Sequence, residues 1–402
     1  MRILFVNKFF YLRGGSEQVF FQERNSMKNS GHSVVDFSMH DEKNIPSKYS
    51  QHFVPRIDYK QSGNFADKIR KSNNFIHSRM AVSKISELIS RYSPQIAHLH
   101  NIYHQLTPSI IPVLKSAGVK IILTLHDAKL VCPTYLMLSH DKICSACKGR
   151  YFYKVITTRC QDSLFKSLLF SAEAYWHRWK GSYDQVDHFI SPSRFYAELV
   201  SRYRVPYRRI SVIPNGVDIN RLTPMYNDED YILYFGRLSN EKGIKTLLEA
   251  HSRIKNGMTL KIVGTGSLEE EIKSRLKNVE FLGYKSGEEL ISLINSASFI
   301  AVPSEWYENC SMVVLEAMAL GKAVIGARIG GIPEQIEDGK SGFLFEMGNI
   351  AELTSKMEKL IAEPNLRKKM GKLGRAIVEE KYSLERHFER LTNLYEYLLG
   401  NN

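Results

Sequence analysis

The sequence predicts an α/β protein with two doubly wound, parallel-sheet domains that face one another across a cleft. Short apolar segments alternate with amphipathic helical segments in both halves of the chain, the pattern of parallel strands joined by crossover helices. The chain has 402 residues, 43% of them hydrophobic, which is enough to bury more than one core. Rossmann-like sheets of this kind bind ligands at the carboxyl ends of their strands, so we expect the active site in the cleft.

The first predicted domain spans residues 1–220. Gly14 and Gly15 follow its first strand, and Ser16 is expected to cap the next helix. Backbone N–H groups in such a turn can approach a phosphate because glycine has no Cβ, but two glycines are also typical of an ordinary turn. The predicted strands of this domain are Arg2–Val6, Gln95–His100, Val119–Leu125 and His188–Ser191.

The second predicted domain spans residues 221–381, and an amphipathic helix follows it in residues 382–402. A linker, Arg221–Asp230, is marked by a proline and an acidic cluster. Gly266 lies in a tight loop after one of the strands. The predicted strands of this domain are Tyr231–Phe235, Leu260–Gly264, Val279–Leu282, Phe299–Val302 and Ala323–Gly326.

Two carboxylates, Glu308 and Glu316, lie eight positions apart around an apolar run. At about 3.6 residues per turn, eight residues make slightly over two turns, so we expect both on nearly the same helix face, roughly 12 Å apart. Glu308 would lie at the helix N-terminus, where free N–H groups favour an anion or a polar ligand edge. Alone, this spacing is also typical of a surface helix with two solvated glutamates. The candidate ligand-binding residues here are Glu308, Asn309, Cys310, Ser311 and Glu316.

The longer segment Pro303–Phe343 reads as a strand end, a helix, a glycine stop, a buried strand, a glycine-rich turn and a helix. With this segment, the sequence resembles the retaining GT-B-fold glycosyltransferases of the family-4 type, and the resemblance covers nearly the entire chain. Tyr234–Gly243 looks like the family's loop whose Arg and Lys hold the donor diphosphate. Asn215–Asp218 resembles the family's exit from the first domain.

The resemblance implies the following roles. Glu308 would contact the hydroxyls of the donor sugar and Glu316 the ribose, while Arg237 and Lys242 would hold the diphosphate. The family also implies that the Gly14–Gly15 loop lies beside the diphosphate, that the loop of Gly266 lies near the base, and that the last helix crosses back to the first domain.

Catalysis in such a site is mainly electrostatic. Arg237 and Lys242 can stabilise the departing nucleoside diphosphate more in the transition state than in the ground state, and no catalytic metal is expected. We favour departure and attack on the same face of the sugar. A double displacement would need a carboxylate under the anomeric carbon, and Asp127 and Glu308 are the candidates.

His126 follows a continuous apolar strand at its carboxyl end. A histidine there is often a structural hydrogen-bonding group, but Thr124–Asp127 resembles a family motif whose histidine contacts the donor sugar and the acceptor region. We expect His98 and His100 on opposite faces of their strand, with only His100 reaching the cleft. Asn101 and Tyr103 are then acceptor-side candidates.

Four cysteines, Cys132, Cys144, Cys147 and Cys160, form a C-x11-C-x2-C-x12-C cluster. Four thiolates with one C-x2-C knuckle suit a tetrahedral structural zinc and leave no open position for catalysis, although a strong zinc signature would show two knuckles. A disulfide pair and four unrelated reduced cysteines are the alternatives.

Charge is unevenly divided along the chain. Residues 1–220 carry 31 Lys and Arg against 16 Asp and Glu, a net of +15, and residues 221–402 carry 24 against 26, a net of −2. The segment Leu164–Trp179 is aromatic and basic at helical spacing. It reads either as a core-packing helix or as an interfacial helix on an anionic membrane, with Trp176, Trp179 and Phe165 in the headgroup layer.

The sequence therefore predicts a retaining, hexosyl-transferring enzyme that uses a nucleoside-diphosphate sugar and a glycan or lipid-linked saccharide acceptor. A GT-B-fold sugar-nucleotide epimerase and a non-catalytic, membrane-associated sugar-nucleotide-binding protein are the alternatives. No nucleic-acid-binding module is recognised. No apolar run approaches the roughly 18 residues that span a bilayer, and the first apolar run is too short for a signal peptide, so we expect a cytoplasmic protein, peripheral on the inner face of the membrane.

Overall fold

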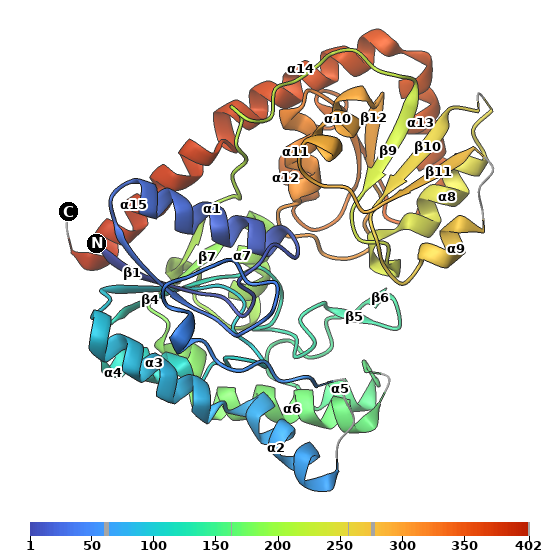
Figure 1. The fold of residues 1–402 in the computed structure, drawn as a ribbon. Helices are drawn as coiled ribbons and strands as arrows, with labels where there is room; N and C mark the ends of the chain where they lie inside the picture. Colours follow the sequence, from blue (N-terminus) through green and yellow to red (C-terminus); the bar gives the residue numbers. More distant parts are fainter. Residues whose placement is uncertain (60–63, 162, 256, 275–277, 401–402) are drawn as a thin grey trace.

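A computed structural model describes residues 1–59, 64–161, 163–255, 257–274 and 278–400. Two six-stranded parallel sheets, one in each half of the chain, form its two halves (Figure 1). The apolar strands are buried on both faces by helices, which produces two large and separate hydrophobic cores. This arrangement confirms the predicted fold class.

The first sheet has the strand order β2-β1-β3-β4-β7-β8. The chain runs from β1 outward to β2 and then returns to the other side of β1, so the order reverses between β1 and β3. Ligands of open parallel sheets bind at such a reversal, beyond the carboxyl ends of the strands. The strands are β1 Arg2–Val6, β2 Ser33–Phe37, β3 Ile96–Leu99, β4 Lys120–Thr124, β7 His188–Ser191 and β8 Ile210–Val212.

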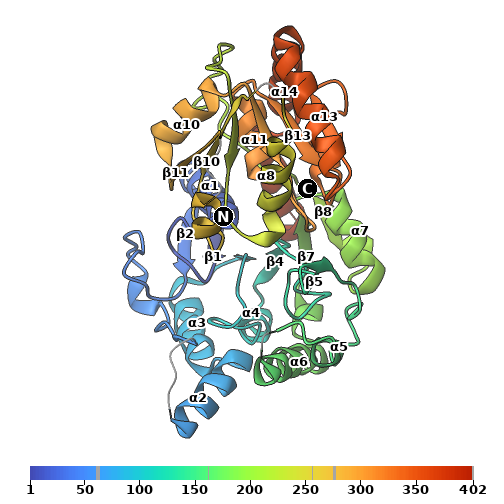
Figure 2. The ribbon, with the colours of Figure 1, turned by 90° about the vertical axis from the view of Figure 1, so that its right-hand side faces the viewer.

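The helices of the first half include a group that lies away from the second sheet. Helices α2, α5 and α6 lie together at the lower end of the molecule in both ribbon views (Figures 1 and 2). The helices and 3₁₀ turns are α1 Gly15–Asn29, η1 Ser50–His52, α2 Phe65–Ile76, α3 Arg79–Tyr92, α4 Ile110–Ser116, α5 Lys154–Thr157, α6 Leu164–Trp179, η2 Ser182–Gln185, α7 Arg194–Tyr203 and η3 Tyr207–Arg209.

The second sheet has the strand order β11-β10-β9-β12-β13-β14. Its order reverses between β9 and β12, so the loops that follow these two strands meet at the carboxyl edge of the sheet. The strands are β9 Tyr231–Phe235, β10 Thr259–Val263, β11 Val279–Gly283, β12 Phe299–Val302, β13 Ala323–Ala327 and β14 Gly342–Phe345.

Helices cover both faces of the second sheet. In Figure 1, α8 and α9 lie to the right of its strands, and α11 and α12 lie to their left. The helices and the 3₁₀ turn of this half are η4 Asn240–Lys242, α8 Ile244–Ser252, α9 Glu269–Lys273, α10 Gly287–Ser296, α11 Met312–Ala319, α12 Ile332–Gln335, α13 Ile350–Ala362 and α14 Pro364–Lys381.

The last helix, α15 Leu384–Leu399, packs on the first half of the chain. Leu391, Leu394 and Tyr395 belong to the core of the first sheet. The two segments that connect the halves also contact each other, because the N–H of Val217 donates to the carbonyl of Tyr382 and the N–H of Leu384 donates to the carbonyl of Val217, both at 2.9 Å.

A small hairpin extends from the first half. Its strands, β5 Leu138–Ser139 and β6 Lys142–Ile143, are joined by His140 and Asp141, which both have positive φ, 50° and 58°. Two such residues match a type I′ turn, which suits the twist of a two-residue hairpin. The side chain of Asn240 donates to Asp141 at 3.1 Å, so the hairpin tip contacts the second half beside Lys242.

One local prediction is wrong. Ser16 does not cap helix α1, because the helix begins at Gly15 with Gly14 in the N-cap position and no side-chain cap. The hydroxyl of Ser16 instead donates to Glu17 at 3.1 Å. The domain bounds 1–220, 221–381 and 382–402 stay a prediction, and the last two residues of the third segment lie outside the described part of the chain.

Candidate active site at the junction of the two sheets

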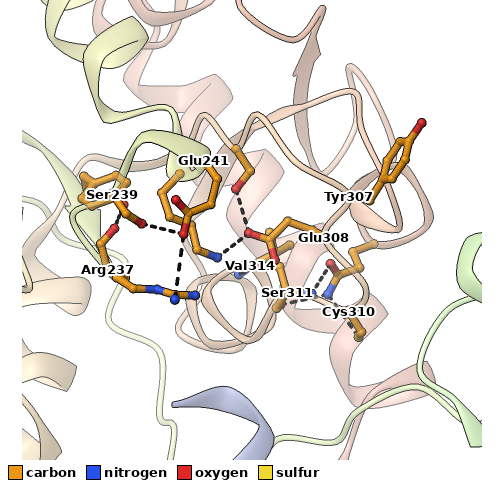
Figure 3. Close-up of polar contacts among 12 residues, drawn as sticks. Arg237, Ser239, Glu241, Tyr307, Glu308, Cys310, Ser311 and Val314 are labelled. Atoms are coloured by element: carbon orange, nitrogen blue, oxygen red, sulfur yellow. Dashed lines mark hydrogen bonds and ion pairs between the residues drawn. The ribbon is translucent and has the colours of Figure 1, made fainter. Parts of the chain in front are cut away.

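The loops after β9 and β12 bring a basic residue and a carboxylate together (Figure 3). The ammonium of Lys242 donates to Oε1 of Glu308 at 2.6 Å, and the hydroxyl of Ser304 donates to the same oxygen at 2.8 Å. Burial alone would raise the pKa of Glu308, but the charge and hydrogen bond of Lys242 outweigh it and hold this pKa below its ordinary value. Glu308 is therefore an ionised, buried group with a cation beside it.

Arg237 lies in the same loop as Lys242 and is much less engaged. Its side chain is 59% exposed, and its guanidinium is 3.9 Å from Glu241. The hydroxyl of Tyr234 donates to the backbone carbonyl of Arg237 at 2.8 Å, which fixes the backbone of this residue. A fixed backbone with an exposed guanidinium suits the binding of a ligand phosphate.

The position of Glu308 corrects the predicted helix geometry. Helix α11 begins at Met312 with Ser311 as its N-cap, so Glu308 lies in the preceding loop and shares no helix face with Glu316. A loop can place a carboxylate independently of helical periodicity. The contact with Lys242 follows from that loop position, not from the spacing of eight residues.

The three residues between Glu308 and α11 use their side chains inside the protein. The amide of Asn309 donates to the carbonyl of Leu125 at 2.5 Å and accepts from Ser193 at 2.7 Å. Cys310 is buried, and burial raises the pKa of its thiol to about 12. Ser311 caps α11. Their predicted role in donor binding stays a prediction.

Glu316 joins the two halves of the molecule. The amide of Gln18 on α1 donates to Oε1 of Glu316 at 3.0 Å. Burial raises the pKa of Glu316, and the hydrogen bond from Gln18 opposes that rise. A Cβ added to Gly15 would lie 3.2 Å from the side chain of Met312, so this glycine lets α1 approach α11 closely.

The other predicted glycines differ in their surroundings. Gly14 has extended backbone geometry and open surroundings, so its position does not require glycine. A Cβ added to Gly266 would lie 2.1 Å from the backbone oxygen of Leu238. Gly266 is therefore needed for close packing against the loop that carries Arg237.

On the first sheet, His126 and Asp127 follow β4 and lie against the loop of Glu308, through the bond from Asn309 to Leu125. The carboxylate of Asp127 accepts from the hydroxyl of Tyr103 and from the N–H of Lys129. Burial raises the pKa of Asp127 to about 6, although Lys129 opposes the rise.

The expectation for His98 and His100 is wrong. Their ring centroids are 4.4 Å apart and both rings contact Glu23, because residues two apart in a strand share a face. Ring nitrogens of His100 and His126 lie 2.8 Å apart, so His100 does approach the site. Asn101 and Tyr103, the acceptor-side candidates, are buried and bonded to each other at 2.9 Å.

All five cysteines are free thiols, which gives no support to a disulfide. Burial raises the pKa of Cys147 to about 12, and Cys132, Cys160 and Cys144 all add to this rise, so the four sulfur atoms lie near one another. They do not form a coordination sphere: within the described residues, only Glu23, His98 and His100 bring three ligand atoms within 4.8 Å of each other. The zinc site stays a prediction.

Helix α6 buries mainly polar side chains, while Phe170 and Ala174 pack against the small cluster of Cys147, Phe152 and Val155, so both interpretations of this helix stay open. Its buried side chains are polar, and Glu173 accepts from the ammonium of Lys129 at 2.7 Å. Trp179 is 73% exposed, and the indole rings of Trp176 and Trp179 are 5.5 Å apart. The large exposed apolar residues of α5, α6 and the preceding loop, here called the aromatic patch, are Tyr151, Tyr153, Leu164, Phe165, Leu168, Tyr175, Trp176 and Trp179.

Sequence reasoning missed several residues at this junction. Glu23 could have been found, because it lies four positions from both Val19 and Met27 on the buried face of its helix. A carboxylate at an apolar-face position needs a partner. Gln18 and Ser304 carry no comparable signal, because polar residues of their type are common on any surface.

A family model described as Glycosyltransferase Family 4 matches residues 13–221, and one described as Glycosyl transferases group 1 matches residues 219–377. An uncharacterized glycosyltransferase of Methanocaldococcus jannaschii is 32% identical over 258 residues, which cover 62% of this chain and 64% of that protein. The chain spans about half to two thirds of the length of the curated relatives it matches.

Two solved structures show the likeness in fold. Sucrose-phosphate synthase from Thermosynechococcus elongatus superimposes with a TM-score of 0.76 at 19% identity, and the match covers 100% of both chains. HepE of Anabaena, solved in complex with UDP-glucose, superimposes with a TM-score of 0.69 at 17% identity over 99% of this chain and 100% of that chain. At these identities the likeness establishes the GT-B fold and nothing more.

Proposed function

Because this chain belongs to glycosyltransferase family 4, we propose that it moves a hexosyl group from a nucleoside-diphosphate sugar to a glycan or lipid-linked saccharide, with retention of configuration at the anomeric carbon. The contact between Lys242 and Glu308 carries this proposal. It supports the proposal because a cation suited to a phosphate and a carboxylate suited to sugar hydroxyls lie together at the carboxyl edge of one sheet, in the same loop region as the exposed guanidinium of Arg237.

In the proposed complex, the diphosphate lies against Arg237 and Lys242, and the sugar hydroxyls donate to Glu308. Glu316 binds the ribose, which requires it to exchange or share its bond with Gln18. The two cations stabilise the negative charge that develops on the leaving diphosphate. UDP is the first nucleotide to test, since HepE was solved with UDP-glucose.

Residues 1–220 form the acceptor-side domain in this proposal, residues 221–381 the donor domain, and residues 382–402 the returning helix. His126 lies between the two domains and contacts the donor sugar. Neither Asp127 nor Glu308 is free in this structure, because Tyr103 and Lys129 hold the first carboxylate and Lys242 and Ser304 hold the second. Their engagement favours departure and attack on one face over a covalent intermediate.

The acceptor side is proposed to bind an anionic membrane through the aromatic patch. The basic side chains around this patch include the exposed Arg150, Arg159, Lys166, Arg178 and Lys180 and the partly exposed Lys154, and the ammonium of Lys180 lies 4.5 Å from the ring centre of Trp179. Aromatic rings beside cations suit the headgroup layer. No helix of the described residues is long and apolar enough to cross a bilayer. We propose peripheral attachment at the cytoplasmic leaflet.

The test of the proposed function is a screen of nucleoside diphosphates and their sugars for thermal stabilisation, followed by detection of sugar transfer. A ligand at 100 times its dissociation constant adds about 2.7 kcal/mol of stability. Stabilisation by at least one nucleoside diphosphate is expected in the wild type and not in Arg237→Ala/Lys242→Ala. If no nucleoside diphosphate stabilises the wild type, the proposal is wrong.

A further inference from the structure

A fully buried carboxylate, Glu23, lies among three histidines from two other elements. Nε2 of His387 on α15 is 2.9 Å from its Oε1. Its Oε2 is 3.2 Å from Nδ1 of His98 and 3.3 Å from Nε2 of His100. Glu23 is 1% exposed, so its negative charge is stabilised by these histidines and not by water.

The partner of Oε1 is a charged histidine. Nδ1 of His387 is 2.6 Å from the carbonyl oxygen of Pro214, which can only accept, so this nitrogen carries a proton. Burial would lower the pKa of His387, but its hydrogen bond to Glu23 and the charge of that carboxylate raise it. Burial would likewise raise the pKa of Glu23, yet the surrounding histidines hold it well below its ordinary value. His387 is therefore charged, and it donates from Nδ1 to the carbonyl of Pro214 and from Nε2 to an ionised Glu23.

The other oxygen of Glu23 faces a chain of two histidines that leads to the site. Oε2 of Glu23 and Nε2 of His100 lie 3.3 Å apart, and within the described residues neither atom makes a hydrogen bond of regular geometry, to the other or to any third group. A carboxylate oxygen accepts, so the proton of His100 belongs on Nε2. Nδ1 of His100 is then an acceptor, 2.8 Å from Nε2 of His126.

We propose that Glu23 and His100 are positioning residues that hold His126 in the Nε2–H tautomer and leave its Nδ1 as an acceptor for a hydroxyl of the substrate. The bond that one ring nitrogen makes determines the state of the other. Burial lowers the pKa of His126 well below its ordinary value, so the ring is neutral and carries one N–H. This N–H lies on Nε2 and donates to Nδ1 of His100.

The tautomer decides what His126 can do in the proposed function, on which this inference rests. With the proton on Nε2, a sugar hydroxyl donates to Nδ1, and the oxygen of that hydroxyl is free to accept from another group. With the proton on Nδ1, the hydroxyl would have to accept instead. Glu23 therefore determines, through His100, whether Nδ1 of His126 accepts or donates a hydrogen bond.

A cation is the competing occupant, because Glu23, His98 and His100 bring ligand atoms within 4.8 Å of one another. Both nitrogens of His98 are already bonded, at 2.6 Å to the hydroxyl of Tyr395 and at 2.7 Å to that of Thr124. These two bonds would have to break for His98 to bind a metal. The hydrogen-bonded chain needs no such change.

The experiment is a long-range ¹H–¹⁵N correlation spectrum of protein labelled at histidine, with the His126 signal assigned by its loss in His126→Asn. The wild type is expected to show the Nε2–H tautomer. Glu23→Met removes the acceptor, so His100 should move its proton to Nδ1 and drive His126 to the Nδ1–H form. His100→Phe keeps an aromatic ring at this position but has no nitrogen that can accept from His126. It should leave His126 as a mixture of tautomers.

Two variants serve as controls. In Glu23→Gln the amide oxygen can still accept from His100 while its NH₂ donates to a neutral His387, so the wild-type tautomer is expected to return. His387→Gln disturbs the same carboxylate from its other oxygen, and it should lower Tm without changing the tautomer of His126.

Turnover provides the second readout. Loss of a partner behind a functional histidine is expected to lower kcat about tenfold in Glu23→Met and His100→Phe, as for other outer-shell partners. The affinity for the nucleoside diphosphate should stay within about twofold. Glu23→Gln should recover most of the loss.

The outcomes separate this inference from the proposed function. If the wild type transfers no sugar, the proposed function fails, and the spectrum still decides the tautomer. An Nδ1–H tautomer in the wild type, or an unchanged tautomer in both Glu23→Met and His100→Phe, would overturn the inference. So would an equivalent of tightly bound metal that Glu23→Gln loses and Cys147→Ser retains. If Glu23→Met does not fold, His100→Phe carries the test.

Discussion

The ammonium of Lys242 lies 2.6 Å from a carboxylate oxygen of Glu308, so the two residues predicted to hold the diphosphate and the sugar hold each other in this structure. Each is the other's main electrostatic partner: Lys242 keeps Glu308 ionised against the effect of burial. A donor that binds here must share the lysine between its phosphate and Glu308. Removing either residue therefore changes the other.

Arg237→Ala and Lys242→Ala are each expected to lower kcat by on the order of 10²–10³, because each removes a preorganised charge from the leaving diphosphate. Arg237→Ala should leave Tm nearly unchanged, since its side chain is 59% exposed. Lys242→Ala should lower Tm, because it leaves Glu308 buried without a counter-charge. Steady-state kinetics and thermal unfolding measure both effects.

The matched control for these two changes is Lys245→Ala, which removes a half-exposed lysine from the adjacent helix α8. It should keep wild-type turnover and Tm. Near-native kcat in both Arg237→Ala and Lys242→Ala would show that neither residue binds the diphosphate.

Glu316→Ala is expected to weaken nucleoside-diphosphate binding roughly 10- to 100-fold, since a hydrogen bond to a charged group contributes about 1.5–3 kcal/mol. Glu308→Ala should instead lower kcat, because its contact with the sugar changes as the anomeric carbon departs. Isothermal titration with the nucleoside diphosphate separates the two. Equal affinity for wild type and Glu316→Ala would show that Glu316 does not bind the ribose. The control is Glu346→Ala, because the side chain of Glu346 is far more exposed.

The buried pair of Glu23 and His387 predicts how stability depends on pH. The folded-state pKa of His387 is raised, so its contribution is present below the unfolded pKa of about 6.5 and is lost as pH rises. The folded-state pKa of Glu23 is lowered, so its contribution is present above about pH 4.3 and is lost as pH falls. The Tm difference between wild type and His387→Gln should therefore be largest near pH 5–6 and smaller at pH 9.

The other titratable or charged groups near this pair are His98, His100, Tyr395 and Arg390, all of which the His387→Gln variant keeps. His188→Gln is the control of opposite sign, because burial lowers the pKa of His188 and makes that histidine unfavourable at low pH. A Tm difference that does not vary between pH 5 and pH 9 would show that folding does not shift the pKa of His387.

Protein purified without chelators is expected to contain about one zinc per chain, bound by Cys132, Cys144, Cys147 and Cys160, and Cys147→Ser should lose it. Zinc would deprotonate thiols such as Cys147, which burial otherwise keeps protonated. Removing it should lower Tm without changing the chemical step. Cys310→Ser should keep the metal, and an absence of zinc in elemental analysis would leave four reduced thiols.

Vesicles that contain anionic lipid are expected to bind the protein more strongly than neutral vesicles, and salt should weaken the binding. Each Lys or Arg near the surface contributes about 1 kcal/mol, so several together give reversible attachment. Replacing Trp176, Trp179, Lys154 and Lys166 together should abolish sedimentation with vesicles. Tyr284→Ala/Tyr397→Ala removes two exposed aromatic residues elsewhere and should have no effect. Equal binding to both vesicle types would contradict the proposed surface.

The sequence predicts most strands well because those strands are buried on both faces and appear as continuous apolar runs, as Phe299–Val302 does. Strand β2 was missed because Asp36 interrupts its apolar run, and its partner Arg24, which lies 2.6 Å away, is on a different element. The hairpin β5–β6 was missed because two-residue strands carry no periodicity.

The site was predicted less completely, for a physical reason. Lys242 and Glu308 could be chosen because their local segments resemble a known family. The bond between Gln18 and Glu316 joins residues 298 positions apart, and that between Glu23 and His387 joins residues 364 apart. Such contacts depend on how the two halves and the last helix pack, which local patterns do not encode.

The two segments that connect the halves are hydrogen-bonded to each other at Val217, so the second half is held at both of its ends along one line. A rotation of one half against the other about this line, here called the spine, would keep these hydrogen bonds. The contact between Asn215 and Cys310 lies near the spine and should barely move. Helices α8 and α9 lie far from this connection (Figure 1), so a rotation about it would displace them more than it displaces Asn215 and Cys310.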